Sequence, residues 1–386
     1  MDKVRFGIIG VGNMGTVHAR SLVEGKVPRA ELVALADLQP AKLEPFPQAR
    51  HFDDGRKLLR AKNLDAVLIA TPHYSHTTLG AAALQRGLHV LVEKPISVHK
   101  ADCQKLIAAY DHRPRPGQVF AAMFNQRTDP FYIKIRELIQ NGALGEIRRV
   151  NWIVSNWFRT EAYYASGGWR ASWAGEGGGV LLNQCPHNLD LFQWLFGMPV
   201  RVRAFCHLGR YHNIEVEDDV TAYFEFANGA TGVFITSTGE APGTNRLEIA
   251  AENGRLVCEG NRICFTKNEA PMSEFSRTSP KPFAAPPTTT EEFTFADHGP
   301  QHVGILQNFV AAILDGQPLI APAVEGIHSV ELANAMLYSS FQKKTVELPL
   351  DARAYARHLK RLIQTSRYVK PETRPTVVAD MTQSFK

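Results

Sequence analysis

The sequence predicts a two-domain α/β protein, in which a doubly wound parallel sheet precedes a domain built on a large, mostly antiparallel sheet. Three observations predict this class. The chain has 386 residues, a length that suits two domains rather than one. Short apolar runs alternate with helical segments over residues 1–125, and strand patterns separated by turns dominate residues 126–350. Residues 351–386 then read as a basic C-terminal helix and tail.

Five short apolar runs are expected to form the parallel sheet of the first domain. They are continuous or β-branched, as strands buried on both faces should be, and they cover residues 4–11, 31–36, 64–70, 88–92 and 119–124. Helical segments stand between them. Residues 76–87 are alanine-rich and end at Gly87, and residues 99–113 stop before Pro114. This alternation of strand and helix predicts a parallel sheet with right-handed crossovers.

After a helix near residues 127–140, the pattern changes to that of an antiparallel sheet. Residues 147–158 alternate, with Trp152 and Val154 on one face. Further strand-like runs cover residues 202–209, 219–226, 231–238, 246–253, 255–260 and 262–267. The dipeptide Asn228-Gly229 separates two of these runs and is a strong hairpin signal. We expect one large sheet from these strands.

Helices and one loop complete the second half. Pro186 suits the first turn of a helix that Gly197 ends. Residues 276–291 are rich in proline and threonine and predict a surface loop. Further helices are predicted at residues 300–315, 324–341 and 351–364.

Composition excludes several classes of protein. With 44% hydrophobic and 21% charged residues, the chain is globular rather than disordered. No apolar run approaches the roughly 18 residues of a membrane span, and the N-terminus lacks a signal-peptide pattern, so we expect a cytoplasmic protein. The five cysteines include no C-x-x-C pair, so neither a disulfide framework nor a metal site is expected. Residues 351–386 carry the whole net charge of +5, which argues against a nucleic-acid partner.

A glycine motif predicts a dinucleotide site at the end of the first strand. Gly10, Gly12 and Gly15 form G-x-G-x-x-G between that strand and a helix, where glycines let the backbone approach a pyrophosphate. Asp37 follows the second strand, near the position expected for a ligand of the ribose hydroxyls. A carboxylate there repels a 2′-phosphate, and neither of the next two residues is a cation. The sequence therefore favours NAD over NADP.

Two further positions suggest catalytic groups. Lys94, in Glu93-Lys94-Pro95, follows the fourth strand, where ligands of doubly wound sheets bind. His187 stands at the start of the helix after Pro186, where the helix N-terminus favours a neutral imidazole that can act as a base. The structural alternatives are a lysine on a surface turn and a capping histidine paired with Asp190.

In combination, these segments resemble the Gfo/Idh/MocA oxidoreductase family. The resemblance lies in Glu93-Lys94-Pro95, in Thr71 to His76 (TPHYSH), and in a triple glycine leading to N-x-x-x-H-x-x-D, and it covers about residues 3–350. It implies a Rossmann domain joined to an α/β domain with a large sheet. By this resemblance, Lys94 holds the substrate hydroxyl near the nicotinamide and His187 exchanges the hydroxyl proton. Many inositol-dehydrogenase-like members have Asp where this chain has Asn183, which implies different polyol contacts.

The expected site residues follow from the motifs and the resemblance together. The expected cofactor ligands are Gly10, Gly12, Asn13, Met14, Gly15, Asp37, Thr71, Pro72, His73, His76, Glu93, Lys94, Asn125, Trp169 and Arg170. The expected substrate ligands are Asn183, Tyr163, Arg127 and Asp190, with Lys94 and His187 as catalytic groups.

The function expected from these residues is NAD-dependent oxidation of a secondary hydroxyl of a sugar, sugar derivative or inositol to a ketone. Two alternatives stay open: a redox glycosidase or lyase with tightly held NAD, and a non-catalytic dinucleotide sensor. The second half shows no cluster of phosphate ligands, so an unphosphorylated sugar or cyclitol is the expected substrate. An exposed face of the large sheet would be costly in water, so we also expect a homodimer or homotetramer.

Overall fold

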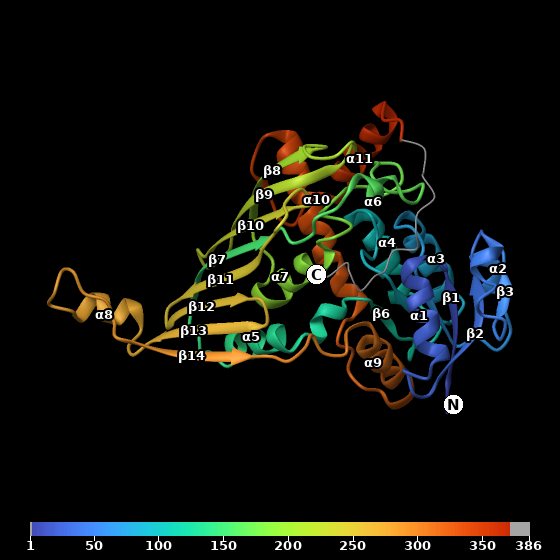
Figure 1. The fold of residues 1–386 in the computed structure, drawn as a ribbon, viewed down its shortest axis with the longest axis horizontal. Coiled ribbons are helices and arrows are strands. Elements are labelled where there is room, and N and C mark those ends of the chain that lie inside the picture. The colour runs from blue at the N-terminus through green and yellow to red at the C-terminus, as the bar shows by residue number, and fades with distance from the viewer. Residues whose placement is uncertain (1, 371–386) are drawn as a thin grey trace.

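The computed structural model describes residues 2–370 and contains two sheets, shown in Figure 1. The first sheet has six parallel strands in the order β3-β2-β1-β4-β5-β6. Its strands are β1 (Val4–Ile9), β2 (Ala30–Ala36), β3 (Arg50–Phe52), β4 (Ala66–Ile69), β5 (His89–Val92) and β6 (Phe120–Ala122). Its helices are α1 (Asn13–Val23), α2 (Gly55–Leu58), α3 (Tyr74–Gln85) and α4 (Lys100–Asp111). The predicted doubly wound domain is confirmed.

The edge strand β3 has no counterpart in the sequence prediction. It has three residues and pairs with β2 alone, and Arg50 and His51 in it are exposed. Because it needs no apolar run, the hydrophobic pattern does not indicate it.

The second sheet has nine strands in the order β14-β13-β12-β11-β7-β10-β9-β8-β15. These are β7 (Ile147–Val154), β8 (Arg201–Leu208), β9 (Glu217–Glu225), β10 (Thr231–Ser237), β11 (Asn245–Ala251), β12 (Gly254–Glu259), β13 (Arg262–Asn268), β14 (Thr288–Thr294) and β15 (Val346–Glu347). Every pairing between these strands is antiparallel except that of β7 with β10. The predicted large, mostly antiparallel sheet is confirmed.

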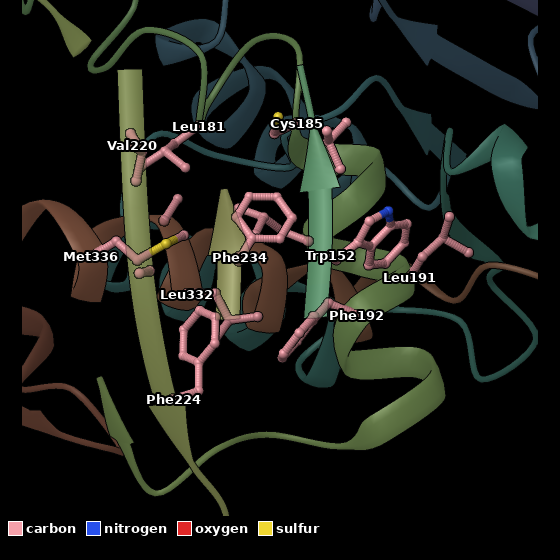
Figure 2. Packing of buried hydrophobic residues seen from close by; sticks show 14 of the residues in the cluster. Trp152, Leu181, Cys185, Leu191, Phe192, Val220, Phe224, Phe234, Leu332 and Met336 are labelled. Carbon is pink, nitrogen blue, oxygen red and sulfur yellow. The ribbon is translucent and has the colours of Figure 1, made fainter. Parts of the chain in front are cut away.

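Helices cover one face of this sheet and bury its apolar side chains. The helices packed into this core are α5 (Pro130–Gln140), α7 (Pro186–Phe196), α10 (Gly326–Gln342) and α11 (Ala352–Thr365), of which α10 packs on both β8 and α7. The second half of the chain also contains α6 (Glu161–Ala165), α8 (Met272–Thr278) and α9 (Gln301–Asp315). Figure 2 shows the core between sheet and helices, where Phe192 of α7 meets Phe224, with ring centroids 5.0 Å apart, and also meets Phe234. This packing fixes the start of α7, and therefore His187, against the sheet.

The opposite face of the sheet carries apolar side chains that nothing in the described chain covers completely. Phe205 on β8 and Tyr223 on β9 are 55% and 42% exposed. Val233 and Ile235 on β10 continue this outer patch, because Val233 lies opposite Tyr223 in the register. An apolar patch of this kind is typical of a protein interface.

The last part of the described chain returns to the first domain. Ile305, Leu306 and Phe309 of α9 are buried in the core of the parallel sheet, and Phe309 lies against Phe6 of β1 with ring centroids 5.9 Å apart. The predicted boundary near residue 125 stays a prediction, but α9 packs with the domain that precedes that boundary.

The predicted loop at residues 276–291 was partly wrong. Helix α8 ends at Thr278 and strand β14 begins at Thr288, so the loop is shorter than expected. Strand β14 is almost wholly polar and exposed, and its threonines pair with β13 at the sheet edge without any apolar alternation. The helix predicted at 351–364 is α11, whereas the tail beyond residue 370 lies outside the described residues. None of the helices in residues 2–370 combines the length and apolar character of a membrane span.

Candidate active site

The turn between β1 and α1 has the form that a dinucleotide pyrophosphate needs. Gly10 has a φ of +91°, and a Cβ there would lie 2.6 Å from the carbonyl oxygen of Ala70. A Cβ on Gly15 would collide with the carbonyl oxygen of Gly10. A Cβ on Gly12 would meet nothing within 4 Å, so Gly12 faces open space. Asn13 and Met14 open α1 directly after this turn. The geometry therefore leaves room for a ligand at the helix N-terminus.

Asp37 lies beside this turn and holds its backbone. Its carboxylate accepts hydrogen bonds from the backbone N–H groups of Val11 at 2.8 Å and Gln39 at 2.9 Å. Lys42 Nζ lies 3.8 Å from the same carboxylate. Sequence reasoning overlooked this cation, because the short helix at Pro40–Lys42 brings it back toward Asp37 from five residues away.

The segment after β4 is linked to the segment after β5 through His76. Its two ring nitrogens lie 2.8 Å from the carbonyl oxygens of Thr71 and Pro95. The ring is buried, and burial lowers the pKa of His76. His76 thus connects the two strand ends through backbone carbonyl oxygens, and its predicted role as a cofactor ligand stays a prediction. Pro72 beside it is exposed.

His73, Trp169 and Arg170 form a small stack above this strand edge. The His73 ring meets the Trp169 ring edge-on at 5.0 Å, and the Arg170 guanidinium lies 4.4 Å from the Trp169 ring centroid. His73 Nδ1 is 3.2 Å from the carbonyl oxygen of Glu176. Burial lowers the pKa of His73 well below its ordinary value. These contacts bring the predicted Trp169-Arg170 segment to the predicted cofactor edge.

Glu93 is held as a buried carboxylate under Lys94. One oxygen lies 2.7 Å from His18 Nε2, and the other accepts a hydrogen bond from the Lys94 backbone N–H at 3.2 Å. Although burial opposes ionisation, the hydrogen bond from His18 and the charges of nearby groups lower the pKa of Glu93 to about 2. Glu93 therefore carries a negative charge at neutral pH, fixed by a side chain of α1.

Lys94 reaches across to the second domain. Its ammonium donates a hydrogen bond to the carbonyl oxygen of Asn183 at 2.8 Å. Burial lowers the pKa of Lys94, and His187 lies close enough for the Lys94 charge to lower its pKa too. The two predicted catalytic residues, 93 positions apart in the sequence, are thus brought together at the junction of the domains.

His187 occupies the first turn of α7, directly after Pro186. The ring is buried, and its edge-on neighbour is Phe124, with ring centroids 6.4 Å apart. Burial and the charge of Lys94 lower the pKa of His187 well below its ordinary value, so the ring is neutral. It forms no hydrogen bond with any residue between 2 and 370, so a ring nitrogen is available to accept a proton.

The substrate ligands predicted around Lys94 divide into two groups. Tyr163 and Asn183 stay at the site: the Tyr163 hydroxyl lies 3.3 Å from Asn183 Oδ1 and accepts a hydrogen bond from Gln184 Nε2 at 2.9 Å. Arg127 and Asp190 instead pair with each other through two hydrogen bonds of 2.7 Å, and both are buried. The structure shows them as a buried ion pair, and their predicted role in binding substrate stays a prediction.

The Arg127–Asp190 pair could not have been found from local sequence, because its members lie 63 positions apart. Arg127 also reaches Glu325 at 2.5 Å, so it connects the segment after β6 to α7 and to the turn before α10. Removing one member of such a buried ion pair is strongly destabilising, because the other charge is left buried without a partner.

Other residues of the site were not indicated by the sequence motifs. Glu176 is buried and accepts hydrogen bonds from the side chain of Asn183 and from the Ala171 backbone N–H. His302 of α9 approaches His18, with ring centroids 5.7 Å apart. A charged residue within the glycine run 175–179 was a usable signal for Glu176. His302 had none, since α9 returns from far along the chain.

Unpartnered polar atoms mark where ligands would bind. Thr71 Oγ1, Asn125 Oδ1 and His187 Nδ1 are buried and have no hydrogen-bond partner among residues 2–370. Buried polar atoms are normally paired. Together with the open space at Gly12 and the carboxylate of Asp37, they fit a dinucleotide along the strand ends and a polar substrate beside His187. No group of three potential metal ligands occurs among residues 2–370.

Comparison with known proteins gives matches over both domains. A family described as "Oxidoreductase family, NAD-binding Rossmann fold" matches residues 4–120, and "GFO/IDH/MocA C-terminal domain" matches residues 132–257. Inositol 2-dehydrogenase of Rhizobium meliloti (strain 1021) is 26% identical over 361 residues, which are 89% of this chain and 99% of that protein.

Two further relatives agree. Myo-inositol 2-dehydrogenase of Thermotoga maritima is 27% identical over 271 residues, which are 67% of this chain and 76% of that protein. The structure of the WlbA dehydrogenase from Bordetella pertussis, in complex with NADH and UDP-GlcNAcA, has a TM-score of 0.75 and 26% identity. It covers 90% of this chain and 100% of its own.

Proposed function

Because the chain belongs to the Gfo/Idh/MocA oxidoreductase family and has its NAD-binding Rossmann domain, we propose that it is an NAD-dependent sugar or polyol dehydrogenase. Its reaction would oxidise a secondary hydroxyl of an unphosphorylated sugar, sugar derivative or inositol to a ketone. The observation that carries this proposal is the meeting of Lys94 with Asn183, beside a neutral His187, at the junction of the two domains.

The side chains at this junction supply the proton chemistry of such an oxidation. The neutral His187 ring takes the hydroxyl proton on a ring nitrogen that no described residue occupies. Lys94 uses one N–H on the carbonyl oxygen of Asn183, which leaves two for the substrate oxygen as negative charge develops on it. NAD, held at the turn after β1 and beside Asp37, would supply the acceptor for the hydride of the carbinol carbon.

The polar groups around Lys94 support a polyol substrate. Tyr163, Asn183 and Gln184 form a hydrogen-bonded set whose amide and phenol groups suit sugar hydroxyls. The side-chain oxygen Oε1 of Gln184 is buried and has no hydrogen-bond partner among the described residues, so it is available to a donor group of the substrate. Two relatives named above are inositol 2-dehydrogenases, which agrees with a cyclitol or a sugar.

The test is NADH absorbance with purified protein, NAD and a panel of inositols, free sugars and glycosides. An increase in NADH absorbance with at least one compound of the panel supports the proposal, provided that Lys94→Ala abolishes this increase. Conversion of a glycoside without net NADH would instead identify a redox glycosidase or lyase. Tight NAD binding without conversion of any member would point to a sensor.

A further inference from the structure

Glu176 is a buried carboxylate, 1% exposed, and it forms no ion pair within 4.0 Å in the part of the chain that the structure describes. Burial raises its pKa, whereas the charges of Arg170 and Lys370 and the hydrogen bond from Asn183 oppose this increase. One oxygen accepts a hydrogen bond from the Ala171 backbone N–H at 2.8 Å, and the other accepts one from the Asn183 side-chain amide. Burying a carboxylate in this way is costly, so its retention calls for a functional reason.

The hydrogen bonds of Glu176 lead directly to Lys94. Asn183 receives the ammonium of Lys94 on its backbone carbonyl oxygen at 2.8 Å. The side chain of the same Asn183 is fixed at both ends, because its amide nitrogen donates to Glu176 and its amide oxygen accepts from Tyr163. Glu176 therefore helps to set the position of the oxygen that holds Lys94.

Glu176 also balances the charge that surrounds Lys94. Burial and the charges of Arg170 and Arg159 lower the pKa of Lys94. The charges of Glu93 and Glu176 raise it. The other titratable groups that interact electrostatically with Lys94 are His73, His76, His187, His302 and Cys185, of which the histidines have lowered pKa values and the thiol a raised one. Glu93 and Glu176 are thus the carboxyl groups that face this ammonium, against two guanidinium groups, and the pKa of Glu93 is lowered whereas burial raises that of Glu176.

We propose that Glu176 is a positioning residue for the reaction, which holds Asn183 in place and keeps the Lys94 ammonium charged and oriented toward the substrate oxygen. The proposal rests on the proposed function, because a dehydrogenase needs that charge when the substrate alkoxide develops. The carboxylate of the site is thus at position 176, seven positions before residue 183, and residue 183 itself is a neutral asparagine.

The first test is Glu176→Gln, which keeps shape and removes the charge. The apparent pKa of Lys94 is measured on the folded protein from the pH dependence of its acetylation by acetic anhydride, read by mass spectrometry. In parallel, kcat/KM is measured against pH with the substrate found in the panel. We expect the Lys94 pKa and the alkaline limb of kcat/KM both to move down by about one pH unit, since a nearby opposite charge favours the charged form.

A matched control is Glu217→Gln. Glu217 is also buried, and it accepts a hydrogen bond from the Leu181 backbone N–H at 3.0 Å in the same segment. It forms no hydrogen bond with Asn183 or Lys94 among the described residues, burial raises its pKa to about 7, and its electrostatic neighbour in this segment is Glu176. We expect Glu217→Gln to leave the acetylation profile of Lys94 and the alkaline limb where they are in the wild type.

The exchange variant Glu176→Gln/Asn183→Asp covers the case in which the single variant does not fold. The introduced amide at position 176 can accept from Ala171 and donate to the introduced carboxylate at position 183, so one charge and the hydrogen bond are both kept. We expect this variant to restore the Lys94 pKa and the alkaline limb toward wild-type values. A Lys94 pKa in the exchange variant well below the wild-type value would overturn the proposal.

The outcomes separate this proposal from the proposed function. An unchanged acetylation profile in folded Glu176→Gln would show that Glu176 does not act on Lys94. A shifted profile with an unchanged alkaline limb would show that Glu176 acts on Lys94 but not on the reaction, which also overturns the proposal. If no panel member is oxidised, the proposed function fails, and the acetylation profile still reports whether Glu176 acts on Lys94.

Discussion

Lys94 and Lys100 offer a direct comparison, because both are lysines at the domain junction and only one of them is placed at the proposed reaction centre. Lys94 donates to the Asn183 carbonyl oxygen and has two further N–H groups for a substrate. Lys100 is buried, and its ammonium lies 2.6 Å from Glu331 and 3.0 Å from the carbonyl oxygen of Leu350. We predict that Lys94→Met lowers kcat with little change in stability, whereas Lys100→Met lowers stability with little change in kcat.

Lys94→Met should lower kcat by about 10² to 10³, the usual cost of removing one donor that stabilises a developing oxyanion. Stability should change little. The lost hydrogen bond is worth about 1.5 to 3 kcal/mol when one partner is charged, but the cost of burying part of the ammonium is removed with it.

Lys100→Met should leave kcat near the wild-type value and lower the free energy of unfolding by about 3 to 5 kcal/mol, because it strands the buried carboxylate of Glu331. Steady-state rates with NAD and urea unfolding curves measure the two effects. The reasoning is refuted if Lys94→Met keeps wild-type kcat while folded, or if Lys100→Met loses activity without losing stability.

Three further predictions concern the base, the cofactor and the assembly. His187→Ala should lower kcat by about 10² to 10⁴. Because the pKa of His187 is lowered, the wild-type rate should stay level as the pH falls through 6.5, where an ordinary histidine would gain its proton. A fall in the wild-type rate near that pH contradicts this prediction. In fluorescence titrations, Asp37→Ala should weaken binding of NAD more than that of NADP, and Lys42→Ala should weaken binding of NADP more than that of NAD. The reason is that these two side chains lie 3.8 Å apart where the ribose of the cofactor is expected. Equal effects on both cofactors count against the assignment. The wild-type protein should be a dimer or tetramer by light scattering, and Phe205→Asp/Tyr223→Asp, on the outer face of the large sheet, should shift it toward the monomer; a monomeric wild type at micromolar concentration removes the basis for this prediction.

The sequence was sufficient where the signal is local. The glycine turn, the lysine after β5 and the proline that starts α7 each follow from neighbouring residues, and the structure places Lys94 and His187 at one junction. Strand periodicity likewise predicted most of both sheets. Strands β3, β14 and β15 were not predicted, because they lie at sheet edges and are short or bury little apolar surface.

Contacts between distant segments could not be predicted in the same way. Nothing near Arg127 in the sequence indicates that Asp190 neutralises it, so both were assigned to substrate. His76 looked like a ligand because of its position after β4, but its partners are two carbonyl oxygens, one of them 19 positions away. In each case, the side chain has a polar function, and tertiary structure decides whether a ligand or the protein satisfies it.

The central claim is that the chain removes hydride from a carbinol carbon and a proton from its oxygen, with Lys94 and His187 at that oxygen. Its most direct test is the transfer of deuterium from perdeuterated inositols and sugars to NAD, followed by mass spectrometry of the cofactor. The account predicts NADH carrying a single deuterium with the wild-type protein and at least one substrate, and almost none with His187→Ala or Lys94→Met. Reduced cofactor without deuterium, or labelling by His187→Ala or Lys94→Met equal to that by the wild-type protein, would contradict it.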